Sequence, residues 1–451
     1  MRYVCAECGY STPSWMGRCP QCGGWNTFFA EKDEKVRQKK QSSPRVMPVT
    51  LAELDESSLQ RYSRFTTGFS EVDRVLGGGI VAGSLVLLSG DPGIGKSTLL
   101  FEIAHKVALQ GKRVLYVSSE ESLAQIHLRI KRFQVEKTPH LFLLSTGIFE
   151  NVLDAFEALS PELAIIDSIQ NLSREESDFL PGSVALLRDL SAHFMEIAKN
   201  RHVALILVGH VTKEGVVAGP RTLEHLVDVV LYLEGDPNRP LRFLRSMKNR
   251  FGSTQEVGLL ELTEGGFVEV ADPSRYFLSD GEHAPRIGVA RTVLAEGKRA
   301  MVVEIQSLVH PSFLDFPRRV SLGVDLNRVH LLLAVIEKVA RVRFSRQDVY
   351  VSIAGGIRTS EASLDLALCA SLVSSRLERE VRKDTVFCGE VGLGGEVRSV
   401  PFLESRLQEA LRIGIRRAVL ARDQRLSLRL SGMEYTSYGN ILELFRGEGL
   451  L

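Results

Sequence analysis

Short apolar runs alternate with amphipathic segments through the middle of the chain. The apolar runs, rich in β-branched and aliphatic residues, predict fully buried strands at 86–88, 114–117, 141–144, 163–166 and 203–208. Helices are predicted between these strands, near 97–109, 122–134, 150–159 and 183–200. Because alternating strands and helices form parallel sheets with helices on both faces, this part of the chain is predicted to be an α/β domain.

The pattern changes on either side of this region. Around 229–270 one strand follows another, which predicts antiparallel hairpins that extend the sheet. Residues 31–48 mix charges, glutamine, serine and prolines, as solvated linkers do. Beyond Asp272-Pro273, a separate α+β domain is predicted. Its predicted strands are 300–309, 349–353 and 417–420, and its predicted helices are 328–340, 361–378 and 402–412. The predicted organisation is a small module at 1–29, a linker at 30–63, an α/β domain at 64–272 and a further domain at 273–451.

Composition and charge narrow the function classes. The chain has 451 residues, 44% of them hydrophobic and 25% charged, which is ordinary for a globular protein. Its 56 basic and 55 acidic residues give a net charge of +1, which excludes a globally basic nucleic-acid coat but not a local basic channel. The sequence has neither an apolar stretch of roughly 18–20 residues for a membrane span nor the apolar core of a signal peptide after Met1. We therefore expect a cytoplasmic protein with reduced thiols and no membrane partner.

Four of the six cysteines lie close together near the first residue. Cys5 and Cys8 form one Cys-x2-Cys pair, Cys19 and Cys22 form a second, and each pair is followed by glycine. Two tight turns that each present two thiolates suit a tetrahedral Zn²⁺ ion, and four protein ligands make such a site structural. A redox-active pair of dithiols is the alternative. The metal is expected to supply folding energy that a module of about thirty residues cannot obtain from a core. The other two cysteines lie in apolar surroundings and are predicted to be core residues: Cys369 and Cys388.

A glycine-rich segment lies between the first predicted strand and the first predicted helix. Its sequence, Gly90-Asp91-Pro92-Gly93-Ile94-Gly95-Lys96-Ser97, fits G-x-x-x-x-G-K-[ST], a phosphate loop, in the strand-to-helix context that this motif requires. We expect backbone amides of the loop to bind phosphate, Lys96 to reach the β- and γ-phosphates of ATP, and Ser97 to bind Mg²⁺. Thr98, the next residue of the helix, is expected near the α-phosphate.

Polar residues at the ends of three other predicted strands complete a hydrolytic site. Asp167 follows the fourth apolar run and is predicted to be the carboxylate of the Mg²⁺ site. Glu120 and Glu121 follow the second run; Glu120 is the preferred candidate for orienting the attacking water and Glu121 is the alternative. The structural alternative for both residues is that they lie at the start of a helix, where the helix dipole favours negative charge. His210 follows the fifth run, where a polar side chain can contact the γ-phosphate.

These motifs resemble the RecA-like ATPase core that recombinases, KaiC-type proteins and replicative ring helicases share. The resemblance rests on the phosphate loop and on four upstream elements: Thr67-Gly68-Phe69, Asp73, Leu76-Gly77-Gly78-Gly79 and Gly83-Ser84. With the four-cysteine module, the pentapeptide Lys248-Asn249-Arg250-Phe251-Gly252 and the C-terminal domain, essentially the whole chain is similar to the RadA (Sms) family of bacterial DNA repair proteins.

The resemblance implies a ring, usually a hexamer, that holds ATP at its subunit interfaces and hydrolyses it in response to DNA. It implies binding of single-stranded DNA and branch migration of recombination intermediates, with recombinase and replication proteins as partners. Lys248 and Arg250 resemble a pair of cations that reaches the γ-phosphate of the neighbouring subunit. Loops at 173–182 and 212–222 are candidates for the DNA path. In the second, Lys213 and Arg221 are the expected phosphate contacts, so binding is expected to be independent of sequence.

The C-terminal domain resembles the proteolytic domain of Lon near Ser363 and along 389–397. Lon uses a Ser–Lys dyad, in which a lysine of lowered pKa activates the serine. Here Ser363 falls near the nucleophile position, but ungapped matching puts Glu404 where the lysine is needed. The domain is therefore interpreted as proteolytically inactive and reused for ring assembly and DNA contact. Its arginines indicate either a solvated face or a basic surface for duplex DNA: Arg318, Arg319, Arg328, Arg341, Arg343 and Arg346.

Three functional hypotheses follow from the sequence. The leading one is an ATP-driven motor that translocates on single-stranded DNA and promotes branch migration. The second is an ATP-dependent protease whose ring feeds substrate to the C-terminal domain, and the missing lysine argues against it. The third is a nucleotide-gated scaffold without motor activity, which ATP hydrolysis indifferent to DNA would favour.

Overall fold

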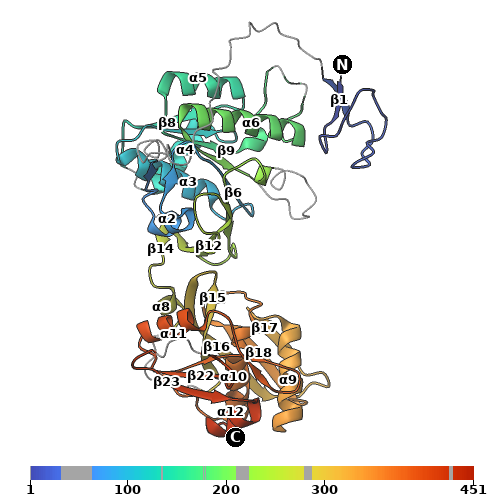
Figure 1. Cartoon of the computed structure of the whole chain (residues 1–451), viewed down its shortest axis with the longest axis vertical. Coiled ribbons are helices and arrows are strands. Elements are labelled where there is room, and N and C mark those ends of the chain that lie inside the picture. Colours follow the sequence, from blue (N-terminus) through green and yellow to red (C-terminus); the bar gives the residue numbers. More distant parts are fainter. Residues whose placement is uncertain are drawn as a thin grey trace, which may run out of the picture. The chain divides into compact units, whose positions relative to one another are not determined.

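The computed structural model describes residues 2–31, 63–133, 136–175, 177, 179–209, 223–278, 287–425 and 430–451. They form two compact units, Met1–Glu269 and Val270–Leu451 (Figure 1). In the described parts of the chain, no helix has both the length and the apolar character that crossing a membrane requires.

The first residues form a small three-stranded antiparallel sheet. In it, β1 (Arg2–Cys5) lies between β2 (Ser11–Thr12) and β3 (Phe28–Glu31). The buried cluster of this module contains little more than two cysteines and Phe28. Apolar burial on this scale cannot hold a fold together, so the module depends on another source of stability.

A nine-stranded sheet forms the centre of the first unit, in the order β14-β13-β12-β11-β6-β10-β9-β7-β8. The parallel strands are β6 (Leu85–Gly90), β7 (Val114–Ser118), β8 (Leu141–Ser145), β9 (Leu163–Asp167), β10 (Ala204–Val208) and β11 (Val229–Glu234). Antiparallel hairpins extend the sheet through β12 (Leu241–Asn249), β13 (Val257–Thr263) and β14 (Gly266–Glu269). Both the parallel core and the hairpins that follow it match the sequence pattern.

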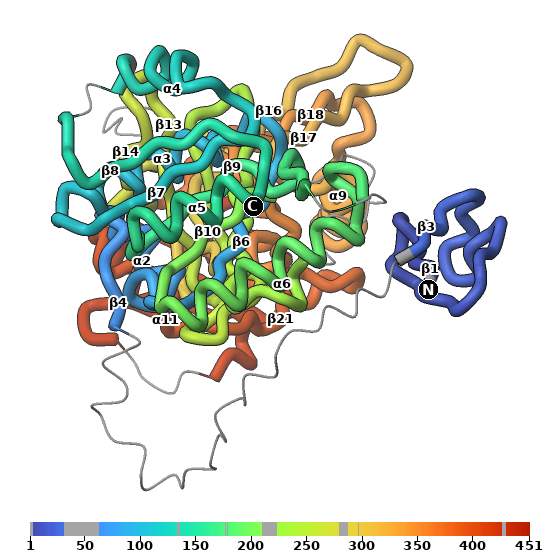
Figure 2. The backbone as a smooth tube through the Cα atoms, turned by 90° about the horizontal axis from the view of Figure 1, so that it is seen from above, coloured from blue at the N-terminus to red at the C-terminus, as the bar shows by residue number. Residues whose placement is uncertain are grey.

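Helices cover both faces of this sheet. Val86 and Leu88 of β6 belong to one apolar cluster, and Leu85 and Leu87 belong to the other, because successive residues of a strand point to opposite faces. The first cluster takes in α2 (Ser70–Leu76), α3 (Lys96–Leu109) and α4 (Leu123–Ile130). The second takes in α5 (Phe149–Leu159) and α6 (Val184–Arg201), which lie side by side in Figure 2.

One predicted strand is less buried than expected. β8 is the last strand of the sheet and pairs only with β7, so its side chains from Leu141 to Leu144 are half-buried. The other four predicted strands are buried as expected. An apolar run predicts a strand but not its place in the sheet, because that place depends on pairing with distant strands.

The second unit has a mixed sheet of seven strands in the order β17-β18-β16-β15-β19-β22-β23. Its strands are β15 (Val289–Glu296), β16 (Arg299–Pro311), β17 (Arg319–Leu322), β18 (Gln347–Ile353), β19 (Thr385–Cys388), β22 (Arg417–Ala421) and β23 (Glu434–Tyr438). Its helices are α8 (Pro273–Phe277), α9 (Leu326–Ala340), α10 (Asp365–Leu377), α11 (Leu403–Arg412) and α12 (Ile441–Gly447). The combination of antiparallel and parallel pairs confirms the predicted α+β class.

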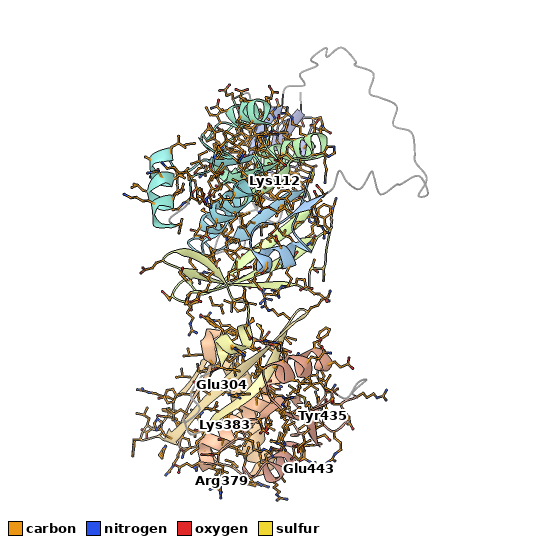
Figure 3. All side chains as sticks on the ribbon, turned by 90° about the vertical axis from the view of Figure 1, so that its left-hand side faces the viewer. Lys112, Glu304, Arg379, Lys383, Tyr435 and Glu443 are labelled. Carbon is orange, nitrogen blue, oxygen red and sulfur yellow. The ribbon has the colours of Figure 1, made fainter. Side chains whose placement is uncertain are left out.

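The core of the second unit contains both C-terminal cysteines. Cys369 and Cys388 are fully buried, as their apolar neighbours predicted. Glu304, labelled in Figure 3, is fully buried as well, and Arg291 Nε donates a hydrogen bond of 3.1 Å to its carboxylate. A buried charge is tolerated in this way only when it is paired.

Candidate nucleotide and zinc sites

The phosphate loop joins the carboxyl end of β6 to the first turn of α3. Gly93 and Gly95 have φ angles of +75° and +111°, which other residues rarely adopt. Space is restricted as well, because a Cβ atom on Gly95 would lie 2.9 Å from the ring of Phe267. The loop therefore brings backbone amides and the positive end of the helix dipole to one point, an arrangement that binds phosphate.

Lys96 is held in place by carbonyl groups of its own loop. Its side chain is buried, and Nζ donates hydrogen bonds to the carbonyl oxygens of Gly90 at 2.9 Å and Asp91 at 3.0 Å. Burial lowers the pKa of Lys96, while the negative charges of Asp167, Asp91 and Glu120 act in the opposite direction. The structure thus brings the lysine together with the two acids expected at the strand ends.

Asp167 ends β9 and lies beside Tyr116 of β7. The Tyr116 hydroxyl donates a 2.7 Å hydrogen bond to Asp167 Oδ2, and both side chains are buried. Burial, together with the charge of Asp167, raises the pKa of Tyr116 well above its usual range, so the phenol keeps its proton. Tyr116 thereby orients the carboxylate. The sequence gives no sign of this contact, because Tyr116 resembles any other apolar residue of a buried strand.

The residues predicted to bind Mg²⁺ have suitable chemistry. Magnesium prefers oxygen ligands, and Asp167 supplies a carboxylate from the end of β9. Ser97 supplies a hydroxyl from the first turn of α3. Tyr116 fixes one Asp167 oxygen, which restricts the orientation of the other. These two residues therefore fit the ion predicted from the motif.

The two adjacent glutamates after β7 have different surroundings. Glu120 Oε1 accepts hydrogen bonds of 2.9 Å from Ser168 Oγ and from Asn171 Nδ2, at the end of β9. Glu121 lies 2.8 Å from Arg129 Nη1 of α4, so its carboxylate is engaged in an ion pair. The arrangement favours Glu120 over Glu121 as the residue that orients water, and this role stays a prediction.

A buried arginine outside the predicted set anchors the phosphate loop. Arg242 of β12 is 3% exposed, and its Nε donates a 2.9 Å hydrogen bond to the carbonyl oxygen of Ile94. Its Nη1 donates to carbonyl groups of the hairpin between β11 and β12, namely those of Asp236, Arg239 and Leu241. Arg242 and Arg245 both lie in this strand, and no local signal marks Arg242 as the one bonded to the loop, because its partner lies 148 residues away.

Lys248 and Arg250 lie near the end of the strands that is opposite to the phosphate loop of their own chain. β12 runs antiparallel to β11, and β11 runs parallel to β6. The last residues of β12 are therefore level with Val86 of β6, whereas the loop begins at Gly90. At the usual rise of a strand, this offset is about 13 Å.

Each of these two cations has partners in its own chain. Lys248 Nζ donates a 2.8 Å hydrogen bond to the carbonyl oxygen of Glu224. Arg250 Nη1 lies 3.5 Å from Asp228 Oδ1, and the Arg250 side chain is 60% exposed. Burial and then the nearby charge of Arg250 lower the pKa of Lys248. β12 ends one residue before Arg250, so strand alternation alone does not place both cations on one face, as their spacing had suggested.

Three predicted site residues lie outside the described residues: His210, Lys213 and Arg221. The whole second candidate DNA loop, 212–222, lies outside them too. In the first candidate loop, Arg174 Nη1 is 2.6 Å from Asp189, and Arg174 Nε is 3.7 Å from Glu150. Acidic neighbours thus offset the charge of the arginine in that loop.

The four cysteines predicted to bind zinc converge in the small module. Their sulfur atoms all lie within 4.8 Å of one another, with 3.7 Å between Cys5 and Cys22 and 3.4 Å between Cys8 and Cys19. Tetrahedral coordination with Zn–S bonds of about 2.3 Å requires similar separations, so the residues fit this ion. Burial raises the pKa of the Cys8 thiol, whereas hydrogen bonds from backbone amides of the two turns act to lower the pKa values of Cys8, Cys19 and Cys22.

In the second unit, the residue that contacts Ser363 is Arg406 and not Glu404. Ser363 is buried in the turn before α10, and Arg406 Nη1 donates a 3.1 Å hydrogen bond to its hydroxyl. Arg406, 1% exposed, also donates to Glu361 and to the carbonyl of Val293. Ungapped matching chose the wrong residue because Glu404 occupies the exposed face of α11.

Two of the six arginines considered for a basic surface have structural roles. Arg328 Nε donates a 3.0 Å hydrogen bond to the buried carboxylate of Asp365. Arg319 Nη2 donates a 2.8 Å hydrogen bond to the carbonyl oxygen of Phe344. A DNA-binding role for the remaining members of the set stays a prediction.

Known protein families match three parts of the chain. The model described as an AAA domain matches residues 52–216, that of a rubredoxin metal-binding domain matches 3–29, and that of subunit ChlI of Mg-chelatase matches 327–424. Among solved structures, a KaiC-like protein from Pyrococcus horikoshii OT3 covers 46% of this chain and 99% of its own at 21% identity and a TM-score of 0.39. A RadB recombinase has the same coverage at 22% identity and a TM-score of 0.36.

A parallel sheet with a phosphate loop after β6 and a buried acid at the end of β9, joined to a zinc ribbon, defines a RecA-like ATPase. DNA repair protein RadA of Bacillus subtilis (strain 168) is 41% identical over 99% of this chain and 98% of its own. The RadA of Aquifex aeolicus is 42% identical over 98% and 97%, respectively. The chain belongs to the RadA family of DNA repair proteins, as its motifs predicted.

Proposed function

We propose that this chain is a DNA-dependent ATPase of recombinational repair that assembles into a ring, translocates on single-stranded DNA and promotes branch migration. The proposed ring is a homo-hexamer in the cytoplasm, where the DNA lies. Its cofactors are ATP, Mg²⁺ and Zn²⁺, and its partners are single-stranded and branched DNA together with recombinase and replication proteins. Membership of the RadA family supports the role in repair.

The distance along the strands between the phosphate loop and the pair Lys248 and Arg250 is the observation that supports a ring. Asn249, which lies between Lys248 and Arg250, is level with Val86 of β6, about 13 Å along the strands from the phosphate loop of the same chain. Cations at that edge are poorly placed to reach a γ-phosphate bound by their own loop. They can complete the site of an adjacent copy, and a head-to-tail contact of this kind closes into a ring.

Each residue has a distinct task in the proposed reaction. The loop amides and Lys96 bind the β- and γ-phosphates. Ser97 and Asp167 hold Mg²⁺, which neutralises negative charge on the phosphates. Glu120 orients the attacking water, and an arginine from the adjacent copy stabilises the charge that develops during phosphoryl transfer. His210, which follows β10 in the sequence, is proposed to report loss of the γ-phosphate to the DNA loop with Lys213 and Arg221.

Mixing two inactive variants tests this arrangement. Lys96→Ala removes the phosphate contact, and Arg250→Ala removes the cation offered to the next copy, so each variant alone is expected to lose DNA-stimulated ATP hydrolysis. In a mixture, the phosphate loop of Arg250→Ala can meet Arg250 of Lys96→Ala. We expect the mixture to regain hydrolysis above the sum of the separate variants.

The controls separate assembly from chemistry. Arg250→Ala should bind ATP with near-normal affinity and retain its oligomeric state. Full hydrolysis by Arg250→Ala alone, or no recovery after verified mixing of subunits, would contradict the shared site. ATP hydrolysis that DNA does not stimulate would instead favour the nucleotide-gated scaffold, which predicts no directional unwinding of a forked substrate.

We propose further that the C-terminal unit is proteolytically inactive. Ser363 would need a neighbouring base, and its closest described cation is the guanidinium of Arg406, which stays protonated and cannot accept a proton. The contact between Arg406 and Glu361 fixes the guanidinium further. ATP-dependent cleavage of casein that Ser363→Ala abolishes would contradict this assignment and support the protease hypothesis.

A further inference from the structure

β12 has a buried arginine near one end and the two proposed trans-acting cations at the other. The Arg242 guanidinium donates to four backbone carbonyl groups, and one of them, that of Ile94, belongs to the phosphate loop. Eight residues further along the chain, Arg250 lies beside Asp228, at the other edge of the sheet. The rise of a strand makes the distance between these two ends about 26 Å.

The segment between these ends is well suited to move as one body. β12 pairs with β13 from Leu241 to Arg245 and with β11 from Phe243 to Asn249. Residues 243–245 therefore have strand partners on both sides, and Leu244 belongs to an apolar cluster. Towards Asn249 only β11 pairs with the strand, with one register shift between Val230 and Leu231. Pairing along most of its length still makes β12 stiffer than a loop. Rigid elements of this kind carry coupling between distant sites.

We propose that Arg242 is a positioning residue that couples successive nucleotide sites of the ring, by tying the phosphate loop of one site to the strand that presents Lys248 and Arg250 to the next. The inference rests on the proposed function, in which those two cations act on the adjacent copy. When phosphate binds to the loop amides, the position of the loop changes, and the hydrogen bond from Arg242 to the Ile94 carbonyl transmits this shift to Arg242. β12 then carries the shift to its far end, where Lys248 and Arg250 lie. Arg242 itself does not contact nucleotide in this scheme.

Arginine has the properties that this connection requires. Its guanidinium is planar and permanently charged, and its five N–H donors form a rigid fork that can hold several carbonyl groups at once. Lysine has a single donor atom on a flexible stem and would not hold the loop and the hairpin together in the same way. An apolar replacement would leave the Ile94 carbonyl and the hairpin carbonyls without this donor, so a change in stability has to be measured apart from a change in coupling.

The test compares Arg242→Met with a control on the same strand, Arg245→Met. Arg245 Nε bonds to Glu234 at 3.0 Å and lies outside the phosphate loop. ATP affinity, melting temperature and the ATP dependence of DNA-stimulated hydrolysis are measured on the full-length protein. We expect Arg242→Met to change ATP affinity less than about threefold, to lower the Hill coefficient for ATP to about one, and to reduce the maximal rate about fivefold or more. Arg245→Met should keep the wild-type Hill coefficient.

Hydrogen exchange supplies a second measurement that needs neither Met variant nor activity. In the double variant Lys248→Ala/Arg250→Ala, contact with the adjacent phosphate is removed, so any change at 246–250 on adding a non-hydrolysable ATP analogue comes from the chain's own loop. We expect slower exchange there. Unchanged exchange at 246–250, a wild-type Hill coefficient of one, or unaltered cooperativity in Arg242→Met would each overturn the coupling. The mixing experiment with Lys96→Ala and Arg250→Ala tests the shared site separately, so the two failures are distinguishable.

Discussion

At the scale of single residues, contacts distinguish side chains that the sequence leaves equivalent. Glu120 and Glu121 are adjacent acids after the same strand, yet Glu120 bonds to Ser168 beside Asp167, and Glu121 pairs with Arg129. Arg129 Nη2 in turn donates a 3.4 Å hydrogen bond to the Tyr116 hydroxyl. Glu121 is therefore linked to Asp167 only through Arg129 and Tyr116, whereas Glu120 bonds directly to the residue that follows Asp167.

These contacts predict different effects for the same conservative change. Glu120→Gln keeps a hydrogen-bond acceptor but loses the charge that orients and polarises water, so the maximal rate of ATP hydrolysis should fall about a hundredfold or more. Glu121→Gln weakens an ion pair at the edge of the site and should change the rate within about threefold. Steady-state hydrolysis at saturating ATP and DNA measures both. Equal losses in the two variants would contradict the assignment of Glu120.

A second prediction concerns Glu102 of α3, whose carboxylate accepts a 2.9 Å hydrogen bond from the amide of Phe267. Burial raises the pKa of Glu102 from 4.5 to about 7. Between these two values the folded protein holds a proton that the unfolded chain has lost, so this group makes the protein less stable as pH rises through that window. Glu102→Gln should therefore raise the free energy of unfolding at pH 8 by about 1 kcal/mol, with little gain at pH 5.

Glu162 is a suitable control because its pKa is shifted in the opposite direction. Although burial acts against it, the hydrogen bond from Lys112 lowers the pKa of Glu162. Its contribution to stability is present above the unfolded pKa and is lost only at lower pH. Glu162→Gln should therefore be less stable than the wild type at both pH 5 and pH 8. Thermal or denaturant unfolding at the two pH values measures both variants, and a gain for Glu102→Gln at pH 5 alone would reverse the expected sign.

The sequence reveals those site residues whose motif is local. Lys96, Ser97 and the glycines of the loop are recognisable because their chemistry needs fixed spacing within one strand-to-helix turn. Asp167 is recognisable because it ends an apolar run. Arg242 and Tyr116 are not, since each contributes through a partner far away in the sequence. The choice of Glu404 instead of Arg406 has the same origin, because the phase of α11 decides which residue faces Ser363.

At the scale of elements, strands and helices were predictable wherever apolar spacing was regular. The antiparallel hairpins after β11 and the longer helices of both units agree with the pattern, whereas the short helices α2, α8 and α12 were not predicted. The partly exposed β8 differs from its prediction because sheet position follows from long-range pairing, which no local pattern encodes. In the zinc ribbon, by contrast, local sequence is enough, because the spacing of the four cysteines predicts the whole module.

Removal of zinc should unfold the ribbon selectively. Its buried cluster is very small, so binding of the metal supplies most of its folding energy. Both tryptophans of the chain, Trp15 and Trp25, lie in this module, so tryptophan fluorescence reports on it alone. Treatment with a strong chelator, or Cys8→Ser, should change the emission spectrum, and the chelator effect should reverse when zinc is restored. An unchanged spectrum after verified zinc loss would show that the ribbon folds without metal.

At the scale of the whole molecule, the first unit holds the proposed nucleotide site, and the second unit is proposed to lack protease activity. Three of the residues proposed for the first unit, His210, Lys213 and Arg221, fall outside the described residues, and the proposed roles of Lys248 and Arg250 depend on an adjacent copy. In the second unit, Ser363 accepts a hydrogen bond from Arg406. The fold class of this unit could be predicted from resemblance, whereas the contact between Ser363 and Arg406 became visible only in three dimensions.

Ser363→Ala therefore tests whether that pair has a chemical role. The change removes one 3.1 Å hydrogen bond from the Arg406 guanidinium, which retains other acceptors. We expect a loss of about 1 kcal/mol in stability and no change in DNA-stimulated ATP hydrolysis or branch migration. A large loss of either activity at unchanged melting temperature would show that Ser363 takes part in chemistry.

The carbonyl groups that bind Lys248 have a consequence for how the molecule works. They belong to Glu224 and His225, just after the segment 212–222 that contains Lys213 and Arg221. One ammonium group cannot stay folded back on these carbonyls and also extend to a phosphate on another copy. Recruitment of Lys248 by a neighbouring copy would therefore break its hydrogen bonds to Glu224 and His225, so that the two contacts of this single side chain exclude each other.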